Sequence, residues 1–136
     1  MRSDLSRARA VLAANDIAAE GSFMHAVHER EFFDQAAFWR LYDAMDVIAA
    51  TPPRRRGRDT RRSAARVQRQ VLMHLIYHLG PHAGGRMAGF PADTLHAWLD
   101  RLDWVFEPVV LGVAGYGPAR FDDDLRPADD QVRQRD

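Results

Sequence analysis

The segment DQAAFWRLYDAMDVIAA, residues 34–50, carries the clearest structural signal in the sequence. Its large apolar residues recur at the three-to-four residue spacing of one helix face; they are Phe38, Leu41, Tyr42, Met45 and Ile48 or Ala49. Asp34 stands directly before this pattern, where an aspartate accepts hydrogen bonds from the first turn. The segment therefore predicts an amphipathic helix that is capped by Asp34 and buries one face in a core.

The residues before this segment also follow helical spacing. Ser3 can cap a first helix in SDLSRARAVLAAND, residues 3–16, because its hydroxyl can accept from the first turn. Gly21 and Ser22 predict a turn before a short helix within residues 23–33.

The residues after this segment predict a break and two further helices. Residues 51–59 contain two prolines and a glycine, which interrupt regular structure. Thr60 can cap a long helix that ends at Leu79, and a last helix starts near Pro91 and Asp93. Pro108 should kink or end that helix, and residues 108–116 could form a short strand. We expect an all-α protein, a compact irregular bundle of four to five helices in one domain over residues 1–121.

Length and composition restrict the class of protein. The chain has 136 residues, of which 46% are apolar and 28% charged, as in ordinary soluble globular domains. Without cysteine, it has no disulfide, zinc–thiolate site or thiol nucleophile. The N-terminal residues lack a signal-peptide pattern, and no apolar run is as long as a membrane span. We therefore expect a cytoplasmic protein.

The apolar stretch VLMHLIYHL, residues 71–79, bears on whether the chain is an enzyme. Seven of its nine residues are apolar and point in all directions, which predicts a central, buried helix. This stretch contains His74 and His78. His25 and His28, with Glu29 or Glu31, could face them across the bundle and complete a metal site. However, no histidine follows a glutamate at the three-residue spacing of helical-bundle metal sites, and HExxH is absent. We expect structural histidines, no metal or cofactor, and no enzymatic activity, since nucleophile motifs and phosphate-binding loops are also missing.

Positive charge is concentrated in residues 54–69, which hold eight arginines and one acid. Clustered arginine is typical of phosphate binding, and Arg62, Arg66 and Arg69 lie on one side of the predicted helix. The run lacks interleaved aromatic residues for base stacking, and the whole chain has no net charge. A solvated arginine-rich loop over residues 51–62 is therefore favoured. The alternative is a small helical nucleic-acid-associated protein that uses Arg54–Arg69 on phosphates.

Negative charge gathers in residues 93–136, which hold ten acids and five arginines. Asp93, Asp100 and Glu107 recur every seven residues and therefore share one face of the last helix, with Asp103 beside them. This face is either an ordinary solvent-facing surface or the contact surface for a basic partner.

Two further candidates for partner binding lie outside the last helix. A polar tail, residues 122–136, begins with Asp122, Asp123 and Asp124. We expect this tail to be mobile. Alternatively, its three acids could form ion pairs with the arginine run. Trp39 stands apart from the apolar stripe of residues 34–50 and is a candidate exposed anchor, because tryptophan is enriched among binding hot spots.

Three stretches in order resemble a known class of protein: EFFDQAAFWRLYDAMDVIA, VLMHLIYHLGPH and LHAWLDRLDWVFEPVVLG. The chain resembles small bacterial immunity proteins of polymorphic-toxin systems, such as those of contact-dependent growth inhibition, over residues 29–112. The resemblance implies a non-enzymatic cytosolic protein that binds one toxin domain and blocks it, with Tyr77, His78 and Trp104 in the scaffold. The arginine-rich insert at residues 54–62 departs from the pattern. Toxins that cut nucleic acid have basic clefts, which the acidic candidates would complement.

Overall fold

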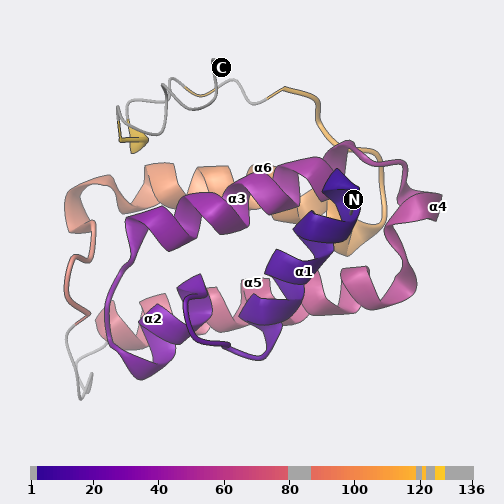
Figure 1. Cartoon of the computed structure of the whole chain (residues 1–136). Coiled ribbons are helices and arrows are strands. Elements are labelled where there is room, and N and C mark those ends of the chain that lie inside the picture. Colours follow the sequence, from indigo (N-terminus) through magenta and orange to yellow (C-terminus); the bar gives the residue numbers. More distant parts are fainter. Residues whose placement is uncertain (1–2, 80–86, 119–120, 122–124, 128–136) are drawn as a thin grey trace.

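The computed structural model describes residues 3–79, 87–118, 121 and 125–127, and every regular element among them is helical (Figure 1). The elements are α1 (Asp4–Asp16), α2 (Phe23–Glu29), α3 (Gln35–Ala50), the single-turn α4 (Pro53–Arg56), α5 (Arg58–Leu79), the 3-10 helix η1 (Ala92–Thr94) and α6 (Leu95–Leu111). This confirms the predicted all-α fold. No helix in the described ranges is long and apolar enough to cross a membrane.

Four helices form a closed ring of contacts. α1 packs against α3 and α5, and α6 packs against the same two helices. Figure 1 shows α3 alongside α6, with α5 running below them. The short α2 contacts α5, α1 and α3 at one end of the ring.

Side-chain caps explain where three of the helices begin. Each cap accepts a hydrogen bond from a backbone amide in the first turn: Ser3 from Ser6, Ser22 from His25, and Asp34 from Ala37. The predicted caps at Ser3 and Asp34 are confirmed, as is the turn at Gly21 and Ser22. The cap predicted at Thr60 is wrong, because α5 already begins at Arg58 and Thr60 is buried inside it.

The core is built on α3 and is rich in aromatic rings. The predicted face of α3 is buried, with Phe38, Leu41, Met45 and Ile48 fully enclosed. Phe38 contacts neighbouring rings edge-on, at centroid distances of 5.6 Å to Phe23 and 4.8 Å to Trp98. Edge-to-face pairs at these distances add to the free energy of apolar burial.

The C-terminal part of the fold shows that the last helix does not end at Pro108 and that the possible strand after it is absent. Pro108 lies inside α6, which continues to Leu111 and ends where Gly112 adopts a left-handed conformation with φ of 71°. Residues 108–116 form no strand. Pro108 removes one helical hydrogen bond, the one that a backbone N–H at this position would donate to the Trp104 carbonyl one turn earlier.

The prediction of a central, buried helix over residues 71–79 is also wrong. Val71 and Leu75 are buried, but Leu72, Ile76 and Leu79 lie on an exposed face of α5, with 40%, 60% and 62% of their surfaces accessible. α5 is one side of the ring rather than its centre, so only one face meets α1 and α6. An unusually apolar helix face is thus left in contact with solvent.

Arg56 joins the C-terminal ends of α3 and α6. Its guanidinium is buried and donates hydrogen bonds to five backbone carbonyls: Ile48, Ala49, Thr51, Pro108 and Val113, at 2.7–3.2 Å. Helix C-termini leave carbonyls without helical donors, and these are the groups that Arg56 serves. Burial lowers the pKa of Arg56 from its ordinary value.

Other arginines of the basic run also stabilise the fold. Arg61 donates to the Val110 carbonyl at 2.7 Å, and Arg66 forms two hydrogen bonds with the Asp16 carboxylate at 2.6 and 2.9 Å. The hydrogen bond from Arg66 lowers the pKa of Asp16. The residues predicted as a solvated loop therefore include α4 and a buried cation.

Candidate partner-binding surface

The outer face of α6 carries an acidic row formed by Asp100, Asp103 and Glu107. The spacing of three and four residues places these carboxylates along one side of the helix. They line a hollow of about 390 Å³ together with three aromatic rings, Trp104, Tyr116 and Phe121. We call this hollow the acidic pocket. Its outer rings come from the chain that follows α6, so the fold brings carboxylates and aromatic faces together.

The carboxylates of the acidic row repel one another. Partial desolvation, the charge and hydrogen bonding of Glu107, and the charge of Asp100 raise the pKa of Asp103. Partial desolvation and a hydrogen bond to Glu107 likewise raise the pKa of Tyr116. Within the described residues, no basic side chain forms an ion pair with this row. The row therefore presents negative charge that the described part of the molecule leaves unpaired.

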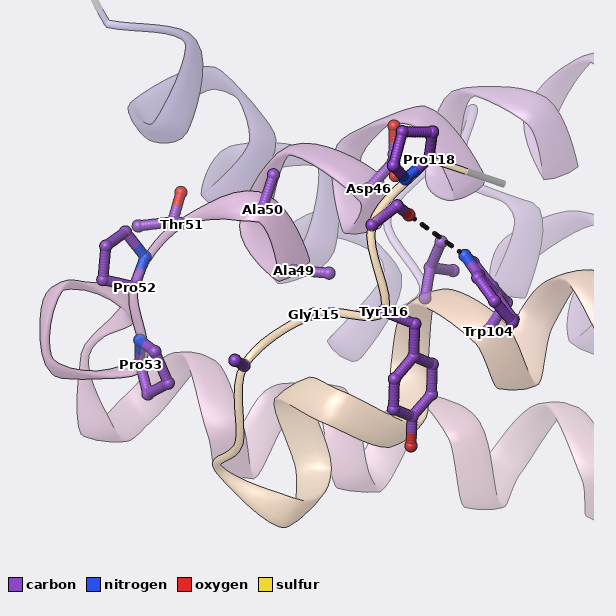
Figure 2. A pocket seen from close by; sticks show the side chains of 13 residues that line it. Asp46, Ala49, Ala50, Thr51, Pro52, Pro53, Trp104, Gly115, Tyr116 and Pro118 are labelled. Carbon is purple, nitrogen blue, oxygen red and sulfur yellow. Dashed lines mark hydrogen bonds between the residues drawn. The ribbon is translucent and has the colours of Figure 1, made fainter. Parts of the chain in front are cut away.

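A second hollow adjoins the acidic pocket and shares Trp104 and Tyr116 with it. This apolar groove has a volume of about 670 Å³ and lies between the end of α3 and the chain after α6. Figure 2 shows Pro52 and Pro53 at one end of the groove and Trp104 at the other. Trp104 donates its indole N–H to the Gly117 carbonyl at 3.3 Å, which fixes the ring against the groove wall.

Two contacts hold the groove in a defined shape. The Arg56 guanidinium donates to the Val113 carbonyl at 2.7 Å and also to the Ala49 carbonyl at the end of α3. Gly115 approaches α3 so closely that a Cβ there would lie 2.5 Å from the Ala49 carbonyl oxygen, so the position requires glycine. The wall formed by residues 113–118 is therefore fastened to α3 at two points, and the groove exists before any partner arrives.

The other sequence-predicted site residues lie apart from this surface. Asp93 is exposed in η1 and does not line either hollow. Asp122, Asp123 and Asp124 lie outside the described residues. Trp39 is not the predicted exposed anchor, because its side chain is only 1% accessible and packs against Trp98 at 5.5 Å.

Trp39 is covered by an arginine from the predicted mobile tail. Arg126 places its guanidinium 4.4 Å from the centre of the Trp39 ring and bonds both carboxylate oxygens of Asp43, at 2.6 and 3.1 Å. Arg126 is itself only 6% accessible. The tail thus has an anchor point on α3 that composition alone did not indicate.

Replacement of Arg126 by alanine should destabilise the fold by about 1–2 kcal/mol, from a partly buried cation–π contact and a half-exposed ion pair. Urea denaturation measures this loss, and acrylamide quenching of tryptophan fluorescence should increase as Trp39 becomes accessible. Arg126→Lys should retain part of both effects. Unchanged quenching in the alanine variant would show that Arg126 does not shield Trp39.

Two of the four histidines considered above, His28 and His74, lie within hydrogen-bonding distance of each other. His28 Nδ1 and His74 Nε2 lie 3.2 Å apart, whereas His78 accepts a hydrogen bond from the Met87 amide at 2.8 Å and stacks on Phe90. No group of three metal-binding side chains occurs among residues 3–79 and 87–118. Burial and the charge of His28 lower the pKa of His74 below 6.5.

This pKa shift predicts a loss of stability in mild acid. Because the folded-state pKa of His74 is lowered, its contribution is complete above pH 6.5 and is lost as the pH falls through the folded-state value. The free energy of unfolding should therefore fall by up to about 1 kcal/mol on acidification. Denaturation at a series of pH values should show a flatter dependence for His74→Asn, whereas the exposed-site control His96→Asn should match the wild type. Equal slopes in all three proteins would contradict the assignment.

In the acidic pocket, sequence reasoning missed Tyr116 and Phe121, and it did not predict the apolar groove. Both follow α6 in a glycine-rich stretch with no periodic pattern, so nothing in the sequence placed their rings over the acidic row. The only available signal was two aromatic residues in an otherwise polar or glycine-rich segment. When the chain is compared with protein-family models, curated proteins and solved structures, none of them matches it.

Proposed function

We propose that this chain is a non-enzymatic immunity protein, which binds the C-terminal domain of a cognate bacterial toxin and neutralises it by stoichiometric occlusion. The observation that carries the proposal is the acidic row on α6, which has no ion pair with the described residues and lies beside two hollows lined by apolar and aromatic side chains. A toxin that cleaves nucleic acid is the partner of matching chemistry, because its active-site cleft is basic.

The two kinds of surface would have different roles in binding. Unpaired carboxylates on a rigid helix attract a basic partner over a distance and raise the association rate. Desolvated aromatic and apolar contacts slow dissociation, because they supply the hot spots of an interface. A protective inhibitor needs both properties, since it must capture a toxin quickly and release it slowly.

The resemblance to immunity proteins also supports the proposal, through the helices that form the framework of the fold. The three stretches that carry the resemblance fall on α3, on the second half of α5, and on α6. Two of these helices also border the candidate surface, because α3 ends at the apolar groove and α6 carries the acidic row.

Calorimetric titration tests the proposal directly. The ligand is the C-terminal domain of the protein encoded immediately upstream, in a catalytically inactive variant if it is toxic. Binding near 1:1 with nanomolar affinity, about −12 kcal/mol, is expected, and the active toxin should be inhibited at equimolar concentration. Higher salt should slow association more than it speeds dissociation. No binding by a folded chain would contradict the proposal.

A nucleic-acid-associated function is the second candidate, and the exposed arginines favour it. Several arginines of the basic run have no ion pair or side-chain hydrogen bond among the described residues: Arg54, Arg55, Arg58, Arg62 and Arg69. Three of these share one face of α5, namely Arg58, Arg62 and Arg69. Salt-dependent retention on DNA that is lost in an Arg62→Ala, Arg69→Ala variant would support this function. Elution from DNA at low salt would exclude it.

A further inference from the structure

The apolar groove offers a ligand few free polar side chains. Most of its lining is proline, alanine, valine and aromatic side chains. Its polar side chains are largely occupied within the chain, since Trp104 donates to Gly117 and the Thr51 hydroxyl donates to the Val47 carbonyl at 2.9 Å. The groove therefore suits a bulky apolar side chain rather than an uncharged polar one.

The groove is also lined by a carboxyl group, that of Asp46. Asp46 is exposed in part, and partial desolvation and the charge of Asp43 raise its pKa, while Arg126 lowers it. With the acidic row on the far side of Trp104 and Tyr116, both hollows are bordered by carboxylates. Charge complementarity therefore specifies a cation next to the apolar group.

We propose that the apolar groove and the acidic pocket together seat one extended segment of the toxin, which carries a bulky apolar residue and an arginine close to it in sequence. The apolar side chain fills the groove against Trp104, and the guanidinium crosses the shared Trp104–Tyr116 wall into the acidic pocket. This assignment rests on the proposed function and specifies the partner's contacting segment.

Arginine fits the acidic pocket better than lysine does. Its planar guanidinium stacks on aromatic faces, which Trp104 and Tyr116 provide, and its paired N–H groups match carboxylates. Phe121 already carries the guanidinium of Arg101, which lies 4.6 Å from the ring centre. The same molecule uses this arrangement elsewhere, where Arg126 lies over Trp39 and binds both oxygens of Asp43. The acidic pocket thus supplies an aromatic ring and a carboxylate, which are the two groups that the Arg126 guanidinium contacts within this fold.

Short peptides test the seat without the toxin. The probes are acetylated, amidated peptides in which phenylalanine and arginine are separated by one, two or three glycines, with matched peptides that contain neutral citrulline in place of arginine. Titration into ¹⁵N-labelled protein should produce saturable shifts of the Gly115 amide and the Trp104 indole N–H, with at least about fivefold weaker binding of the citrulline peptides. No shift of these groups at about 5 mM peptide, or equal shifts with citrulline, overturns the inference.

A filled groove separates this inference from the proposed function. Ala50 is an exposed alanine at the end of α3 that lines the groove, so Ala50→Phe should occupy the seat while leaving the core intact. Ala65→Phe is the matched control, because Ala65 is an exposed alanine of α5 outside both hollows. Toxin affinity should fall at least about tenfold in the first variant and stay unchanged in the second. Equal toxin binding by both would refute the seat yet retain the immunity function, whereas no binding by the wild type would refute the function.

Discussion

Replacement of Arg56 by methionine is expected to lower the free energy of unfolding by about 4 kcal/mol, which is a large part of the stability of a small domain. Methionine has a similar length and apolar bulk to the aliphatic part of arginine, so the change in the free energy of unfolding comes from the lost hydrogen bonds. The carbonyls of Ile48 and Pro108 retain backbone donors from Thr51 and Val113. The loss is therefore concentrated at three carbonyls that depend on the guanidinium, those of Ala49, Thr51 and Val113.

Urea denaturation followed by circular dichroism measures this effect, and thermal unfolding should show a midpoint about 15 °C lower. Arg56→Lys should be nearly as damaging, because one ammonium group cannot reach carbonyls at the ends of two helices. Arg55→Met is the matched control, since Arg55 is exposed and the change should stay within about 0.5 kcal/mol. Equal stability of the Arg55 and Arg56 variants would show that Arg56 does not join α3 to α6.

Arg56 also explains why the basic run is a poor guide to function. Its neighbours Arg54 and Arg55 are exposed, whereas Arg56 is buried among carbonyls and Arg61 binds the end of α6. Sequence reasoning counts all of these as surface charge, because no carboxylate in the sequence marks the buried one. The partners of Arg56 are backbone groups, which every residue carries, so the pattern contains no trace of them.

Most of the helical framework was predictable because its signals are local. Caps at Ser3 and Asp34 depend only on the next three residues, and the stripe on α3 depends only on helical spacing. Besides the cap at Thr60 and the strand after Pro108, the errors concern which face of a helix is covered. Trp39 stood outside the main stripe but is covered by Trp98 and Arg126, whereas Ile76 lies in an apolar stretch and faces solvent.

The candidate surface also has a part that local sequence signals predict and a part that they do not. The acidic row was predictable, because Asp100, Asp103 and Glu107 belong to one helix and their shared side follows from spacing. The aromatic wall was not, because Tyr116 reaches α6 only through a loop. That loop is shaped by the Arg56 hydrogen bond to Val113 and the tight Gly115 contact, both long-range features of the fold.

Reversal of charge at Asp103 is expected to weaken toxin binding about 100-fold, close to 3 kcal/mol, while leaving the fold at least as stable. The cation of Asp103→Lys would repel a basic partner at the centre of the acidic row, and would occupy the pocket intended for a guanidinium. Titration calorimetry with the toxin domain measures the affinity. Asp93→Lys makes the same charge change outside the pocket, so it should slow association only a few-fold through the long-range field.

Stability and affinity should move in opposite directions at Asp103, which distinguishes a binding residue from a structural one. Its pKa is raised in the folded protein, so at neutral pH the ionised carboxylate disfavours the native state, and this penalty disappears as the pH falls. Asp103→Asn should therefore raise the free energy of unfolding at neutral pH by a few tenths of a kcal/mol. The same variant should bind the toxin more weakly. A less stable Asp103→Asn protein with unchanged affinity would instead place Asp103 in the scaffold. The expected result points to binding, because an acid that is repelled by its neighbours lowers stability and is explained by a partner that neutralises it.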